Sequence, residues 1–217
     1  MSVIARDMNT PWTRPHWQAD TQALLAEAHV AAWSDDAHAR QRFASSLHHF
    51  LASQPDTEVW SIGGGAIDSV SSLCRQVGMC YPLGVIEPRL HGLRGLTDAL
   101  RQRGSDAYGC YSRFRYVIWH EADATLNKDP ELFGEIVDAL TGVAAEFEFA
   151  SERLLMIQRT VFVGGSGIEA YGKRRGGQFR SWLGHGSGRP FWEVVTGVES
   201  PDVRVKPLER LVEGGVY

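Results

Sequence analysis

The chain reads RYVIWH over residues 115–120, and this stretch decides the fold class. Aromatic and β-branched residues dominate it, which predicts a β-strand. Two further strands are predicted at EVWSI (58–62) and LLMIQRTVFV (154–163). Each is a short apolar run that stops at glycines, Gly63-Gly64-Gly65 in the first case and Gly164-Gly165 in the second.

Helical patterns fill the intervals between these strands. Asp129-Pro130 is a good helix start, because proline is favoured at the first helical position. Strands that alternate with helices imply a mainly parallel sheet, since a parallel pair needs a crossover connection. The sequence therefore predicts an α/β fold with a small, three-stranded sheet flanked by helices. The apolar residues at helical spacing are Ile67, Val70, Leu73, Val77, Leu93, Leu96, Leu100, Leu132, Phe133, Ile136, Val137, Leu140 and Val143.

The flanking segments have different patterns. Residues 1–55 are interpreted as an arm followed by a helical pair, with one helix over 20–32 and a second that begins after Asp35 and Asp36 and ends at Pro55. Residues 56–165 form the α/β domain. Residues 166–217 are a C-terminal extension whose first part is rich in glycine and basic residues. The apolar positions of the two N-terminal helices are Leu24, Leu25, Ala28, Ala32, Ala39, Phe43, Leu47, Phe50 and Leu51.

Composition excludes several classes of protein. The 217 residues carry a net charge of −4, which argues against a globally basic nucleic-acid binder. Nothing approaches the ~20 apolar residues of a membrane span, so no membrane partner is expected. Cys74, Cys80 and Cys110 contain no C-x-x-C pair and are odd in number, so we expect reduced thiols in a cytoplasmic protein, with Cys74 in the core.

One block resembles a known family. Residues 62–73, IGGGAIDSVSSL, are similar to the first strand, turn and helix of barstar, and 93–100, LRGLTDAL, resembles the next helical segment. The later strand, helix and strand follow in the family's order, so the resemblance covers about residues 56–165. It implies a barstar-like fold and a bacterial protein that binds another protein, as a ribonuclease inhibitor or an immunity protein that occludes a nuclease or other toxin.

The resemblance also implies a binding face. Asp98 stands where barstar has an acidic residue that contacts the ribonuclease, and Tyr81, Arg94 and Thr97 lie beside it in the matched segment. Arg94 replaces an acidic residue of the family, and Thr97 replaces an aromatic one. Electrostatic complementarity sets partner choice, so these changes indicate a partner other than a basic ribonuclease. Glu121 and Asp123 offer a secondary acidic surface.

Two alternative hypotheses belong to other classes. A small enzyme or ligand-binding domain would use the Gly63–Gly65 turn together with His120–Asp123 at the end of a strand, where α/β active sites often lie. A nucleic-acid-associated protein would use the basic, aromatic tail over 170–192 for phosphate contacts and stacking. The favoured interpretation of the glycines is a tight turn, and we expect no catalytic residue, no metal and no cofactor.

Overall fold

The structure, a computed structural model, describes residues 21, 24, 25, 27–63, 65, 67–79, 92, 95–97, 100, 113–149, 157–175 and 203–211. Its centre is one five-stranded sheet in which every pair of neighbours runs parallel, in the order β2-β3-β4-β1-β5. The strands are β1 (His29–Trp33), β2 (Thr57–Gly63), β3 (Phe114–His120), β4 (Ile157–Gly164) and β5 (Val203–Pro207).

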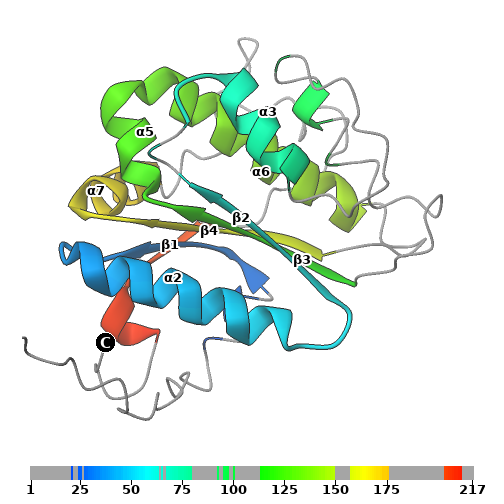
Figure 1. The fold of residues 1–217 in the computed structure, drawn as a ribbon, viewed down its shortest axis with the longest axis horizontal. Helices are drawn as coiled ribbons and strands as arrows, with labels where there is room; N and C mark the ends of the chain where they lie inside the picture. The colour runs from blue at the N-terminus through cyan, green and yellow to red at the C-terminus, as the bar shows by residue number, and fades with distance from the viewer. Residues whose placement is uncertain are drawn as a thin grey trace, which may run out of the picture.

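Helices cover both faces of this sheet (Figure 1). The α-helices are α2 (Ala37–Ala52), α3 (Val70–Met79), α5 (Ala122–Lys128), α6 (Pro130–Phe149) and α7 (Ser166–Arg175), and a short 3₁₀ helix, η4 (Leu208–Arg210), follows β5. Helix α2 lies against one face, whereas α3, α6 and α7 pack on the opposite face. The alternation of side chains along each strand therefore supplies two separate cores.

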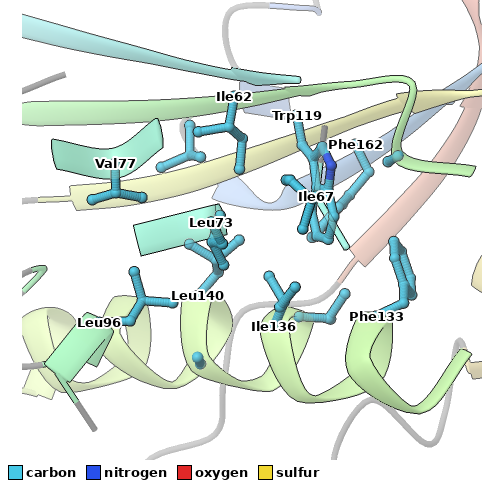
Figure 2. Close-up of a cluster of buried hydrophobic side chains, with 14 of the residues drawn as sticks. Ile62, Ile67, Leu73, Val77, Leu96, Trp119, Phe133, Ile136, Leu140 and Phe162 are labelled. Atoms are coloured by element: carbon cyan, nitrogen blue, oxygen red, sulfur yellow. The ribbon is translucent and has the colours of Figure 1, made fainter. Parts of the chain in front are cut away.

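The larger core lies between the sheet and α6 (Figure 2). Phe133, Ile136 and Leu140 recur on one side of α6 and point toward the sheet. Trp119 of β3 packs on Phe133, with ring centroids 5.0 Å apart, and Phe162 of β4 lies beside them. Burying such side chains contributes roughly 1.5–3 kcal/mol each. This packing fixes β3 and β4 over α6.

Arg115 connects strands near the amino end of the sheet although its side chain is fully buried. Its Nε lies 3.3 Å from a carboxylate oxygen of Glu58, and its Nη1 donates to the carbonyl of Leu100 at 2.8 Å. The guanidinium also stacks over Trp60, 4.3 Å from the ring centroid. A buried charge is tolerated only with such partners, so Arg115 couples β2, β3 and the residue at position 100.

The α/β class and the strands predicted over 58–62 and 115–120 are confirmed, as is the strand over 154–163 from residue 157 on, where the described residues resume, but the prediction of a three-stranded sheet was wrong. Strand β1 lies between β4 and β5, where the sequence predicted the end of a helix over 20–32. Residues 21, 24, 25 and 27 are helical, and the chain turns into a strand at His29. The alanines of β1 have little intrinsic preference for a strand, and pairing on both sides overrides it.

All three predicted segments contribute to this sheet. Strand β1 comes from residues 1–55, β2 to β4 come from 56–165, and β5 comes from the C-terminal extension. The second N-terminal helix is confirmed as α2. Asp36 caps it by accepting the N–H groups of His38 and Ala39 at 2.8 and 3.2 Å. Cys74 is buried as expected, while Cys80 and Cys110 lie outside the described residues.

His29 makes the stability of the fold depend on pH. Its Nδ1 accepts the backbone N–H of Thr160 at 2.9 Å, and the ring is fully buried between strands. Burial, assisted by the nearby charge of Arg159, lowers the pKa of His29 from 6.5 to about 3. The folded state is therefore more stable with the His29 ring neutral than with it protonated.

The unfolded chain takes up a proton at His29 as the pH falls below 6.5, and the folded chain does so only near pH 3. The free energy of unfolding should therefore fall in this window, by up to about 1.4 kcal/mol per pH unit. Urea titrations at several pH values measure this slope. His29→Asn keeps an acceptor for Thr160 and should flatten it, whereas the exposed His38→Asn should not. An equal slope in His29→Asn and wild type would contradict the assignment.

Candidate functional site at the carboxyl end of the sheet

The strand order creates a switch point between β1 and β4. Strand β1 is followed by α2 on one face of the sheet, and its neighbour β4 is followed by α7 on the opposite face. In open α/β sheets, ligands bind at the carboxyl ends of strands where the connections diverge in this way. The ends of β1, β3 and β4 are therefore the first place to look for a site.

The connection from β1 to α2 is short and acidic. It consists of Ser34, Asp35 and Asp36, and both carboxylates serve the backbone. Asp36 caps α2, and Asp35 accepts the N–H of Ser166, at the start of α7, at 3.2 Å. A phosphate-binding loop at this place needs glycines and a lysine. The connection has neither, so it does not form a phosphate cradle of that kind.

The connection from β4 to α7 needs a glycine at position 164. Asp123 accepts the N–H of Gly165 at 3.1 Å. A Cβ at Gly164 would lie 2.4 Å from Cγ1 of Ile168 and 2.9 Å from Oδ1 of Asp123, so no side chain fits there. The close approach holds α5 and the start of α7 together. Asp123 is thus engaged with backbone, and this engagement limits its part in the predicted acidic surface.

A cavity of about 280 Å³ opens beside this junction. Four of its lining residues occupy one side of α2, at intervals of three and four, as one helical face requires. The others come from the ends of β3 and β4. His120 reaches it because it lies two residues beyond Ile118 and so faces α2. The lining residues are Ala37, Arg40, Gln41, Ala44, His120, Glu121 and Val163.

Arg40 brings a positive charge to the cavity. Its Nη1 donates to the carbonyl of Ser34 at 2.7 Å, which fixes the side chain at the end of β1. Its Nε is buried and has no hydrogen-bond partner in the described part of the chain. The carboxylates of Asp35 and Asp123 are close, but they accept backbone N–H groups instead. Arg40 lines the cavity and forms no ion pair with another described residue, so its positive charge can attract an anionic group of a ligand.

Glu121 brings a negative charge from the other side. It stands between β3 and α5 with φ 48° and ψ 42°, in the left-handed region. The left-handed conformation costs a residue with a Cβ roughly 1–2 kcal/mol. Strained backbone conformations of this kind are found most often at functional sites. Oε2 of Glu121 lies 3.4 Å from the position of a Cβ on Gly65. The exposed carboxylate therefore stands at the β2–α3 turn and lines the cavity.

His120 adds a neutral imidazole to the lining of the same cavity. Burial is the main cause that lowers the pKa of His120, the nearby His48 lowers it further, and the carboxylate of Glu121 opposes both. His48 itself shares a hydrogen bond of 2.8 Å with Oγ of Ser61 on β2, and burial lowers the pKa of His48 as well. At neutral pH the His120 ring can therefore donate one hydrogen bond and accept another.

The predicted site residues fall in three groups. Glu121 and His120 line the cavity, and Asp123 is engaged beside it. Thr97 is half-buried on a helical stretch, while Asp98, Arg94 and Tyr81 lie outside the described residues. Of the predicted basic tail over 170–192, residues 176–192 also lie outside them. Gly63 is held by Gln76, which accepts its N–H at 2.7 Å and donates to its carbonyl at 3.2 Å. That bonding supports the tight turn.

Sequence reasoning missed Arg40 and Gln41. Both lie on a helix that was predicted, and their spacing from Ala37 and Ala44 places them on one side of it, but the sequence does not say what that side contacts. Within the described ranges, no group of three or more His, Cys, Asp or Glu side chains has a geometry that would hold a metal ion. Of the helices described, none combines the length and apolar character needed to cross a bilayer.

Comparisons with protein-family models, with curated proteins and with solved structures gave no significant match.

The pKa of His120 reports on the cavity directly. Glu121→Gln removes the one neighbour that raises this pKa and should lower it further, whereas His48→Gln removes a neighbour that lowers it and should raise it. The pH dependence of the His120 ring-proton shift in NMR spectra measures both changes. Shifts of the same sign in the two variants, or none in either, would show that the three side chains do not share this site.

Proposed function

We propose that this chain is an α/β ligand-binding protein whose site is the cavity between α2 and the carboxyl ends of β3 and β4. The observation that carries the proposal is the convergence there of Arg40, His120 and Glu121, a cation, a neutral imidazole and a carboxylate. Few, well-placed polar groups in a concave site are typical of ligand pockets. The switch point of the sheet supplies the same expectation from topology.

Two further features support a ligand rather than a purely structural role. Neither Arg40 nor Glu121 forms an ion pair with any residue that the structure describes, although both line one cavity. Glu121 also holds a strained backbone conformation at the end of β3. A protein gains nothing in stability from either feature, and a bound polar molecule would compensate for the first.

A screen of small polar fragments by amide NMR tests this proposal. We expect shift changes that cluster at Arg40, Gln41, His120 and Glu121. Ala37→Trp places a bulky ring at the exposed rim of the cavity and should abolish these changes. Ala52→Trp, at the exposed far end of the same helix, is the matched control and should bind as wild type does. Fragments that bind equally to both variants, or no binding at all, would overturn the proposal.

We also propose a second candidate function, a barstar-like inhibitor or immunity-type binder of a nuclease or other toxin. It is supported by the arrangement of β2, β3 and β4, which are consecutive parallel neighbours with α3 and α6 on one face. The order of these strands and helices along the chain is the one that the resemblance over 56–165 implies, although the sheet has two further strands. The binding face would be Asp98 with Tyr81, Arg94 and Thr97.

Pull-down from a native lysate tests this second candidate. Wild type should retain a nuclease or other toxin, and Asp98→Ala should release most of it, because loss of a buried charged contact weakens binding strongly. Glu131→Ala, an exposed residue on α6, is the control and should retain the partner. Retention that is equal in all three proteins would exclude a binding face centred on Asp98.

A further inference from the structure

The cavity has a balanced pair of charges. Its lining carries one cation, Arg40, and one carboxylate, Glu121, and its other polar members, Gln41 and His120, are uncharged at neutral pH. Arg40 and Glu121 are not within salt-bridge distance of each other, nor of any other described side chain of opposite charge. Two opposite charges thus face one space without neutralising each other.

The charges around the cavity make a simple anion a poor ligand. Asp35 and Asp123 lie near Arg40, around Gly165, and Glu121 closes the other side. A ligand with only a negative charge gains from Arg40 but is repelled by these carboxylates. A ligand with only a positive charge gains from Glu121 but is repelled by the guanidinium of Arg40. A molecule with both charges satisfies both sides.

We propose that the cavity binds a small dipolar ion, an aminocarboxylate of the amino-acid type. Its carboxylate pairs with the guanidinium of Arg40 in a charge-assisted hydrogen bond, and its ammonium group donates to Glu121. The aliphatic part lies against Ala37, Ala44 and Val163. His120 and Gln41 supply neutral hydrogen bonds to either end. This inference rests on the proposed ligand-binding function and names the class of ligand for that site.

The ligand series for the test varies one charge at a time. Isothermal titration of the full chain would use leucine, β-alanine, γ-aminobutyrate and ε-aminocaproate, which span different separations of the two charges. The N-acetyl form of each compound keeps only the carboxylate, and the amide form keeps only the ammonium group. We expect at least one free aminocarboxylate to bind about tenfold or more tightly than both of its derivatives.

Protein variants assign each charge to its partner. Arg40→Gln should remove the preference for the free compound over its amide, and Glu121→Gln should remove the preference over the N-acetyl form. Arg42→Gln, an exposed residue on the same helix, is the control and should leave both preferences intact. Circular dichroism of each variant shows whether the fold is retained. If Arg40→Gln does not fold, the comparison of Glu121→Gln with wild type decides whether the cavity recognises the ammonium group.

The outcomes separate this inference from the function on which it rests. If N-acetyl or amide forms bind at the cavity as tightly as the free compounds, the dipolar-ion proposal is wrong, and a ligand-binding site remains. If none of the series binds but other fragments perturb Arg40 and Glu121, the ligand class is likewise wrong. If nothing binds at the cavity in either experiment, both proposals fail.

Discussion

The pairing of β1 with both β4 and β5 is the constraint on which the rest of the structure depends. Val30 lies opposite Val161 on one side and opposite Arg204 on the other; all five residues of β1 pair with β5, and residues 30–33 also pair with β4. Since α2 and α7 leave neighbouring strands toward opposite faces, this placement of β1 separates the two helices at the carboxyl end of the sheet. The cavity opens beside this junction, between α2 and the ends of β3 and β4.

The polar groups around the cavity have two different roles. Asp35, Asp36 and Asp123 stabilise the starts of α2 and α7 by accepting backbone N–H groups, where a negative charge also suits the helix dipole. Arg40 donates to the carbonyl of Ser34, but neither Arg40 nor Glu121 forms an ion pair among the described residues. Structural carboxylates near the guanidinium change what it can select, because they repel anions that lack a compensating positive charge. Selectivity for a dipolar molecule follows from this arrangement.

The elements that the sequence predicted well are those whose local pattern agrees with their tertiary setting. The stretch RYVIWH has strand-forming residues and is a central strand, and Asp36 has a capping side chain and caps a helix. Strand β1 was missed because Ala31 and Ala32 favour a helix, and only burial against β4 and β5 makes them a strand. Local pattern carries no information about a partner strand that lies more than a hundred residues away.

The candidate site was only partly predictable for a related reason. His120 and Glu121 could be singled out because they follow a convincing strand, and the ends of parallel strands are where α/β sites form. Arg40 could not, since nothing in the sequence of α2 says that it crosses the end of β3. A crystal structure of the full chain with a bound aminocarboxylate tests the account most directly. The account predicts the ligand carboxylate on Arg40 and its ammonium group at Glu121. A ligand bound elsewhere, or an Arg40 side chain paired with Asp35 or Asp123 in that crystal, would contradict it.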